Sequence, residues 1–158
     1  MMGRGLSDLQ KTMIILAKEE EKKWLNAHRN EELKARYLEW DKSLNYSRLE
    51  RFNEIDKHPE FMVFVLDNWN GRIFFSEIYQ KVYGWKPIKT RNPKDMHTYF
   101  RPDEFSKKEI GLNKYMSVYM AVRKAAERLE ERGLINIEKR GSYYWITQEG
   151  MKKAELLA

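Results

Sequence analysis

The 158-residue sequence predicts a mainly α-helical fold with one small β-hairpin. The first observation is a helical repeat near the C-terminus, where apolar residues recur every three or four positions; these are Val118, Val122, Ala125 or Ala126, and Leu129. The second is a pair of short runs with apolar or aromatic residues at alternate positions, which is typical of strands; these residues are Ile135, Ile137, Tyr143 and Trp145. Helix-capping signals along the rest of the chain are the third.

In this C-terminal region, a glycine separates the predicted helix from the first strand, and a basic tip separates the two strands. Gly133 predicts the end of the helix, because glycine readily adopts the left-handed conformation of a C-terminal cap, and Leu134 can then fold back onto the last turn. Residues 139–142 (KRGS) form a basic tip between the two predicted strands. Thr147 closes the second strand and can cap a last helix that runs to Leu157.

Two short runs in this region carry a family resemblance. Residues 128–135 (RLEERGLI), followed after the hairpin by residues 146–150 (ITQEG), resemble the signature of winged helix-turn-helix DNA-binding regulators, the MarR-like and related bacterial and archaeal families. The resemblance covers about a quarter of the chain. It implies a winged helix-turn-helix with an N-terminal helical extension, whose third helix lies in the major groove and whose wing touches the DNA backbone.

By matching position, the resemblance also implies which residues contact DNA. They are Lys114, Ser117, Met120, Ala121, Arg123, Lys124 and Arg128 on the helix, with Lys139 and Arg140 on the wing. Met120 and Ala121 stand where the family commonly has small hydroxylated residues. The preferred DNA sequence of the family therefore does not carry over to this chain.

The predicted winged helix domain spans residues 58–158, and residues 1–57 form an N-terminal extension. The domain's first helix is expected over residues 59–69, an apolar stretch in which a proline occupies the first turn. Residues 72–75 then form a short extended link. Ser76 is expected to cap a second helix that ends before Gly84.

The extension contains three capping signals. Ser7 with Gln10 forms a capping box for a first helix, Asn30 can cap a second, and a box of Ser47 with Glu50 predicts a further short helix. The second helix carries an apolar stripe of Leu33, Tyr37, Trp40 and Leu44. This stripe either packs within its own domain or, as a candidate dimerisation element, against another chain.

The positive charge of the chain is confined to one segment. The net charge is +6, and residues 84–142 contain 14 basic and 8 acidic residues, whereas the flanking segments are balanced. Such a surplus is often ordinary surface chemistry, but its confinement to the predicted helix and wing favours a phosphate-binding surface.

The connection at residues 85–113 is a long basic loop, where a helix-turn-helix needs about three or four residues. Loops of this length tend to be functional or disordered. It is either an insertion without a role or an arm that follows the DNA backbone. Ser106 with Glu109 predicts one short helical turn inside it.

The sequence gives little support to other function classes. It has no cysteine, no apolar run long enough for a membrane helix, no signal peptide and no glycine-rich phosphate loop. The three histidines are scattered, and only Asp95 with His97 approaches metal-ligand spacing. Pro102-Asp103 matches the start of a nuclease motif, but the acidic-x-lysine triplet that would complete it is missing downstream. We therefore expect a cytoplasmic protein without catalytic residues, metal or cofactor.

Two functions remain open from the sequence. The first is a transcriptional regulator that binds double-stranded DNA as a homodimer, with residues before Pro59 forming the dimer. The second is a winged helix used as a protein-interaction or replication-complex module with nonspecific nucleic-acid binding.

Overall fold

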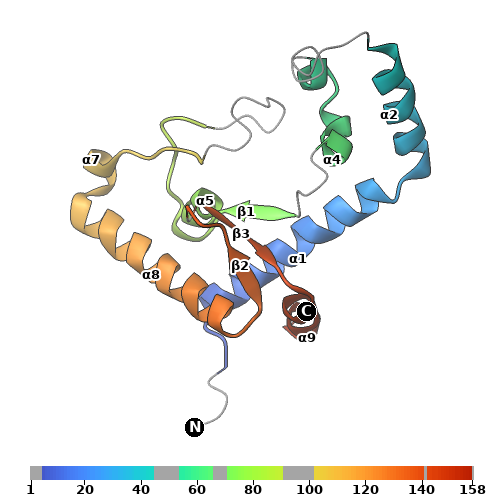
Figure 1. The fold of residues 1–158 in the computed structure, drawn as a ribbon. Helices are drawn as coiled ribbons and strands as arrows, with labels where there is room; N and C mark the ends of the chain where they lie inside the picture. The colour runs from blue at the N-terminus through green and yellow to red at the C-terminus, as the bar shows by residue number, and fades with distance from the viewer. Residues whose placement is uncertain (1–4, 45–53, 66–70, 91–101, 141, 158) are drawn as a thin grey trace. The chain divides into compact units, whose positions relative to one another are not determined.

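The computed structural model describes residues 5–44, 54–65, 71–90, 102–140 and 142–157. Among these residues helices predominate, and three short strands form one antiparallel sheet (Figure 1). The predicted mainly α fold with a small β element is thereby confirmed. Within the described ranges, no helix is both long enough and apolar enough to cross a membrane.

The described residues sort into two compact units. Unit 1 combines those of Met1–Glu21, Gly71–Thr90 and Pro102–Ala158, and unit 2 comprises those of Lys22–Asn70. Contacts therefore group the chain differently from the predicted division between residues 57 and 58. The N-terminal residues belong with the hairpin region, and the stretch that follows them forms a separate unit.

Unit 1 begins with the first part of helix α1 (Asp8–His28). The predicted capping box is confirmed: the Ser7 N–H donates to Gln10 Oε1 at 3.0 Å, and the Gln10 N–H donates to Ser7 Oγ at 3.2 Å. The Gln10 amide also donates to the Ala125 carbonyl at 3.4 Å. This face of α1 enters the core of unit 1 through Met13, Ile14 and Ala17, which are fully buried.

The sheet of unit 1 has the strand order β1-β3-β2. The predicted hairpin is confirmed as β2 (Ile135–Ile137) and β3 (Tyr143–Ile146). The predicted face of β3 is wrong, because Tyr144 and Ile146 are buried opposite β2, whereas Tyr143 and Trp145 lie on the other face. The expected extended link contains a third strand, β1 (Arg72–Phe74), at the edge. Antiparallel partners in the register include Ile73 with Tyr144 and Ile135 with Ile146. These four side chains point into the core, as the two-residue period of a strand requires.

Helix α5 (Phe75–Tyr83) follows β1 directly. Ser76 was expected to cap a helix that starts at Glu77, and this prediction is wrong because the helix starts two residues earlier, at Phe75. The carboxylate of Glu77 accepts from the Phe74 N–H at 2.8 Å and satisfies the first turn from inside the helix. The helix ends at Gly84 with φ of +69°, the left-handed cap that the sequence predicted.

The predicted third helix is α8 (Leu112–Glu131). Its buried residues are Val118, Val122, Ala125, Ala126 and Leu129, as the helical repeat predicted. Gly133 takes φ of +74°, and the Leu134 N–H donates to the Leu129 carbonyl at 3.0 Å. The turn after the helix thus folds back onto its last turn, and Leu134 is buried there.

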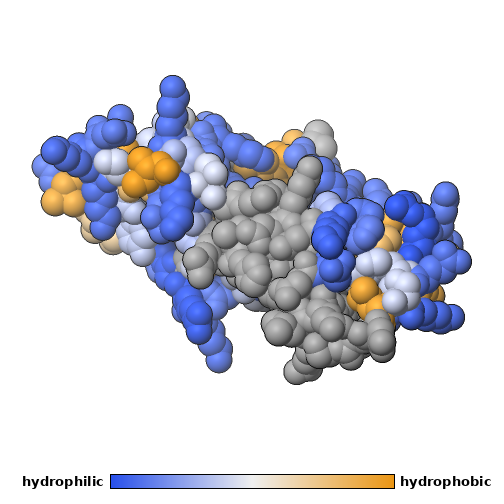
Figure 2. Space-filling view, turned by 90° about the horizontal axis from the view of Figure 1, so that it is seen from above, coloured by the Kyte–Doolittle hydropathy of each residue, from blue (hydrophilic) through white to orange (hydrophobic). Residues whose placement is uncertain are grey.

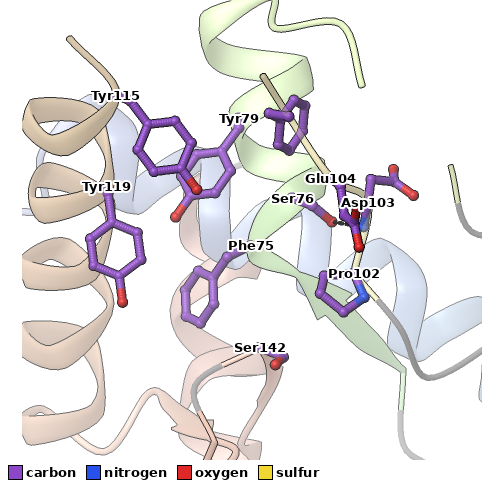
Figure 3. Close-up of a pocket in the computed structure, with 10 residues that line it drawn as sticks. Phe75, Ser76, Tyr79, Pro102, Asp103, Glu104, Tyr115, Tyr119 and Ser142 are labelled. Carbon is purple, nitrogen blue, oxygen red and sulfur yellow. Dashed lines mark hydrogen bonds between the residues drawn. The ribbon is translucent and has the colours of Figure 1, made fainter. Parts of the chain in front are cut away.

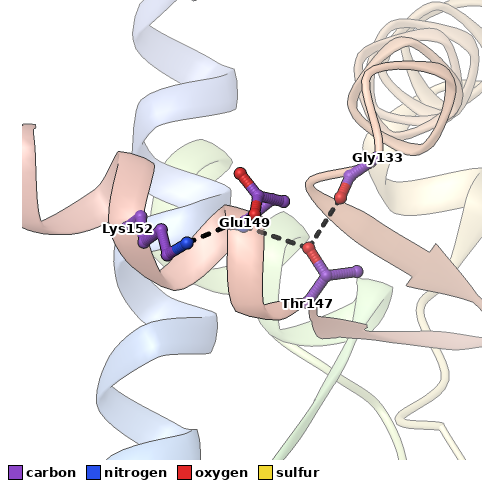
Figure 4. Close-up of polar contacts among 5 residues, drawn as sticks. Gly133, Thr147, Glu149 and Lys152 are labelled. Carbon is purple, nitrogen blue, oxygen red and sulfur yellow. Dashed lines mark hydrogen bonds and ion pairs between the residues drawn. The ribbon is translucent and has the colours of Figure 1, made fainter.

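Thr147 links helix α9 (Gln148–Leu157) to the turn that follows α8 (Figure 4). The Thr147 hydroxyl accepts from the Gly150 N–H at 3.0 Å and donates to the Gly133 carbonyl at 2.6 Å. Its backbone N–H donates to the Leu134 carbonyl at 3.1 Å. The predicted cap is confirmed, and it joins the end of α8, the base of the hairpin and α9.

Unit 2 contains helix α2 (Glu31–Ser43), capped by Asn30 as predicted, since Asn30 Oδ1 accepts from the Leu33 N–H at 3.0 Å. Tyr37 is buried and stacks on Phe64 with ring centroids 5.0 Å apart. Leu33 and Trp40 pack around the same cluster. These three members of the predicted stripe are therefore covered by residues of their own unit.

The stretch expected to be the first helix of the winged domain has a different structure and location. Residues 59–65 form a 3₁₀ turn (η2, Pro59–Phe61) and one short helix, α4 (Met62–Val65), after a further 3₁₀ turn, η1 (Ile55–Lys57). All three belong to unit 2. The helical character is thus borne out for residues 59–65, but Phe61 and Phe64 pack against Tyr37 of α2 and not in the core of unit 1. Residues 66–69 lie outside the described residues. The predicted Ser47–Glu50 box lies outside the described residues.

The long connection between α5 and α8 is packed at both of its described ends. Trp85 is buried and stacks on Tyr115 of α8 with centroids 5.3 Å apart. Glu104 exchanges backbone hydrogen bonds with Ile88 and Lys89 at 2.8 and 2.9 Å. Ser106 caps the short helix α7 (Lys107–Ile110), as predicted. These described ends are parts of the fold, and residues 91–101 lie outside the described ranges.

We expect the stability of unit 1 to fall above about pH 10 because of Tyr144. Its hydroxyl is fully buried and donates to the Met13 carbonyl at 2.7 Å, and burial raises its pKa well above the usual value. The unfolded tyrosine ionises near pH 10 while the folded one stays protonated, so the unfolded state binds fewer protons and gains stability as the pH rises.

Urea titrations between about pH 8 and about pH 11 of the wild type and Tyr144→Phe check this prediction. At neutral pH the variant should be about 1 kcal/mol less stable than the wild type, because it lacks the hydrogen bond of Tyr144 to Met13. Above pH 10 its stability should fall less steeply than that of the wild type, and the difference between the two slopes should approach about 1.4 kcal/mol per pH unit. Equal slopes would show that Tyr144 ionises alike in both states.

Candidate nucleic-acid interface

One row of side chains runs along the exposed face of α8, each member four positions after the last; it consists of Met116, Met120, Lys124 and Arg128. Residues four apart share a face because a helical turn takes 3.6 residues. We name these four residues the α8 row. Lys114, Ser117 and Ala121 are exposed beside it. All the predicted contact residues on this helix except Arg123 are therefore exposed.

The cations of this surface lack ion-pair partners. Within the described ranges, no carboxylate pairs with Lys114, Lys124 or Arg128. Two of the nearby acidic groups are used elsewhere, because Glu130 accepts from the Ile137 N–H at 2.7 Å and Glu127 pairs with Arg123. The positive charge along this face is thus left to solvent or to an anionic ligand.

Arg123 lies on a different flank of α8 from Lys124. It is half-buried, its Nε lies 3.6 Å from Glu127 Oε1, and its guanidinium carbon lies 5.9 Å from the centroid of the Phe75 ring. A direct contact with DNA would have to compete with both interactions. Its predicted role as a base-reading residue is therefore less well supported by geometry than the roles of Lys124 and Arg128.

The described residues of the hairpin tip present two exposed cations, Lys139 and Arg140. The Arg140 N–H donates to the Glu138 carboxylate at 2.8 Å. On the other side of the tip, the Ser142 carbonyl accepts from the Phe75 N–H at 3.1 Å. The tip is therefore attached to the start of α5, which fixes the base from which both cations project.

A cavity of about 410 Å³ lies between α5, the start of α8 and the segment after Pro102. Figure 3 shows aromatic rings from both helices facing it; the residues that line it include Phe75, Tyr79, Phe105, Tyr115 and Tyr119. Burial, together with the neighbouring Tyr115, raises the pKa of Tyr79 well above its usual value. Aromatic rings therefore form much of its wall.

The charges around this cavity balance. Asp103 and Glu104 lie on its wall, and Asp103 Oδ2 accepts from Gln80 Nε2 at 2.6 Å. Two cations lie over its rings, Lys107 with Nζ 5.2 Å from the Tyr115 centroid and Arg123 over Phe75. The cavity wall thus carries two carboxylates, and two cations lie against rings that line it.

Several large apolar side chains are exposed in the N-terminal half of α8. Leu112 is 61% exposed, and Met116 and Met120 are each 45% exposed. Figure 2 shows apolar surface interrupting the hydrophilic surface over the part of unit 1 that holds α7 and the start of α8. The α8 row is thus apolar in its N-terminal half and basic in its C-terminal half.

The described histidines serve as packing groups. The ring of His28 lies 5.6 Å from that of Phe64, and the ring of His58 stacks on Phe61 at 5.4 Å. In the described part of the chain, no group of three or more histidine and acidic residues could hold a metal ion. Asp95 and His97 lie outside it.

Sequence reasoning missed two features of this surface. Met116 belongs to the row because it stands four positions before Met120, and that spacing was visible in the sequence. The cavity wall at Asp103 and Phe105 could not be found in this way, because it depends on how the long connection folds back onto α5.

Comparison of the chain with protein-family models, with curated proteins and with solved structures gives no match. The interface described above therefore rests on the residues of this chain alone.

Proposed function

We propose that unit 1 is a winged helix-turn-helix that binds double-stranded DNA, with α8 in the major groove and the hairpin tip on the backbone. The chain would act in the cytoplasm as a transcriptional regulator. The single observation that carries the proposal is a set of cations on one face of α8 that have no ion-pair partner in the described part of the chain, beside a hairpin whose tip adds two more. Phosphate neutralisation requires such a clustered positive surface.

The order of elements in unit 1 supports the proposal. A helix, an edge strand, two helices and a hairpin follow one another as α1, β1, α5, α8 and β2-β3. The first helix of this order is α1 and not the stretch at residues 59–69. The connection between the second and third helices is longer than in a simple helix-turn-helix, and it contributes α7 and the cavity wall.

Titration of mixed-sequence duplex DNA at two salt concentrations tests this function. The exposed cations of α8 and the hairpin tip that could touch phosphates are Lys114, Lys124, Arg128, Lys139 and Arg140. If all five do, log affinity falls with log salt at a slope of about 4.5, so that a fourfold rise in salt weakens binding roughly 500-fold. Absence of binding at low salt would contradict the proposal.

A protein-interaction module is the second candidate, and the exposed apolar residues favour it. Ile88 and Leu112 are 63% and 61% exposed, and large exposed apolar groups often belong to contact surfaces. In this alternative, DNA binding would be weak and equal for every sequence. Binding-site selection from random duplexes distinguishes the two, because only a regulator enriches one sequence.

We expect Lys139 and Arg140 to bind phosphate and not bases, because a hairpin tip reaches the DNA backbone. Replacing both with alanine should weaken binding to the selected site and to random DNA by similar factors and lower the salt slope by about 1.8. Replacing Lys81, an exposed lysine on α5, serves as a control. Lost discrimination with unchanged affinity for random DNA would contradict a backbone role.

A homodimer remains a prediction for this function, since two copies related by a two-fold axis would read two half-sites about 34 Å apart. In the stripe that suggested it, Tyr37 is buried and Leu33 and Trp40 are half-buried against the aromatic cluster of unit 2, which leaves less of these side chains for a contact between chains. Sedimentation equilibrium of the full chain should give twice the mass of 19.2 kDa. A monomer at tens of micromolar would contradict the prediction.

A further inference from the structure

The N-terminal half of α8 presents apolar side chains where a DNA-reading helix needs contacts to bases. In helix-turn-helix proteins the N-terminal residues of the recognition helix reach the base edges. Here Met116 and Met120 occupy the middle of that face, and each is 45% exposed. A methionine side chain donates no hydrogen bond, and its sulfur is a weak acceptor. The hydrogen-bonding residues Lys114 and Ser117 lie to one side.

The major groove offers one apolar feature that such side chains can recognise. Thymine carries a C5-methyl group there, and every other base edge presents only hydrogen-bonding groups. Met116 and Met120 are about 6 Å apart along the helix axis, which is close to the length of two base pairs. Two neighbouring methyl groups are therefore within reach of the two side chains.

The charges on the same row favour DNA over a protein as the partner of these methionines. Lys124 and Arg128 continue the row about 6 and 12 Å beyond Met120. Phosphates border the major groove on both sides, so a helix placed with its methionines over the bases brings the two cations to the backbone. An apolar protein groove would have to supply acidic groups at the same spacing.

We propose that α8 recognises thymine through its C5-methyl groups, with Met116 and Met120 as the contacting side chains. The inference rests on the proposed function, because it assigns the base contacts of that same helix. Burial of one methyl group strengthens binding about fourfold, so two contacts give a preference of about 15-fold for thymine over uracil. Uracil differs from thymine in DNA only by the missing methyl group.

Alternating poly(dA-dT) and poly(dA-dU) duplexes test the inference with the full-length protein. We expect the wild type to bind the thymine polymer about 15-fold more tightly. The double variant Met116→Gln/Met120→Gln should bring the ratio close to one while still binding both polymers, because its cations are unchanged. Leu156→Gln is the matched control, since Leu156 is an exposed apolar residue on α9, and it should keep the wild-type ratio.

The outcomes separate this inference from the proposed function. Equal wild-type affinity for the two polymers would overturn the thymine contact and leave DNA binding intact. A thymine preference that survives in the double variant would assign the methyl contact to other residues and would also overturn the inference. A wild type that binds neither polymer would overturn the proposed function together with it.

Discussion

Replacing Gly150 with alanine should destabilise unit 1 by about 3 kcal/mol, the upper part of the range for overpacking. A Cβ atom at this position would lie 2.6 Å from Ile146 Cγ1 and closer still to the backbone oxygen of Leu134. That oxygen is held in place because it accepts the Thr147 N–H at 3.1 Å. The added atom therefore has to push α9 away from the base of the hairpin.

Urea unfolding followed by circular dichroism measures this effect, with Gly5→Ala as the control. Gly5 has no atom within 4 Å of an added Cβ, so its replacement should change stability by no more than about 0.5 kcal/mol. A Gly150→Ala protein as stable as the wild type would show that α9 does not pack tightly against this turn.

Replacing Lys124 and Arg128 together with alanine should weaken binding to duplex DNA roughly 60-fold at 0.1 M salt. The reason is counterion release, because a slope of about 0.9 per phosphate contact amounts to about eightfold per contact between 1 M and 0.1 M salt. Both side chains are exposed and unpaired among the described residues, so their removal should leave the fold unchanged. The salt slope should fall by about 1.8.

The matched control also removes two positive charges, but from α9, through Lys152→Ala and Lys153→Ala. It should reduce affinity far less, because those side chains lie on a different helix of the same unit. Fluorescence anisotropy with a labelled duplex measures both variants. Equal losses in the two would mean that the overall charge of the protein, and not the face of α8, determines binding.

Local chemistry explains which parts of the fold could be predicted. The caps at Ser7, Asn30, Ser106 and Thr147 are confirmed because each depends on residues three or so positions away. The end of α8 at Gly133 is likewise a short-range property. The cap at Ser76 failed because the helix starts at Phe75, where Glu77 accepts from the Phe74 N–H, and the sequence does not rank this start against one at Glu77.

Long-range pairing explains what could not be predicted. The stretch at residues 59–69 and α1 both have apolar faces, and the sequence pattern does not show which of them packs against α8. The contacts answer this, because Gln10 of α1 donates to the Ala125 carbonyl of α8 in unit 1, whereas Phe64 stacks on Tyr37 in unit 2. For the candidate site, exposure along α8 followed from its helical period, whereas the packing of Arg123 on Phe75 depends on the position of α5.

Chemical-shift mapping tests most directly whether the exposed face of α8 and the hairpin tip form the DNA-binding surface. Mixed-sequence duplex DNA is added to the ¹⁵N-labelled full-length protein, and backbone amide shifts are followed by NMR. We predict that the largest shifts occur at residues 113–128 and at Lys139 and Arg140, while amides of α9 change little. Shifts confined to α9 or to unit 2, or no shifts at all, would contradict the proposed interface.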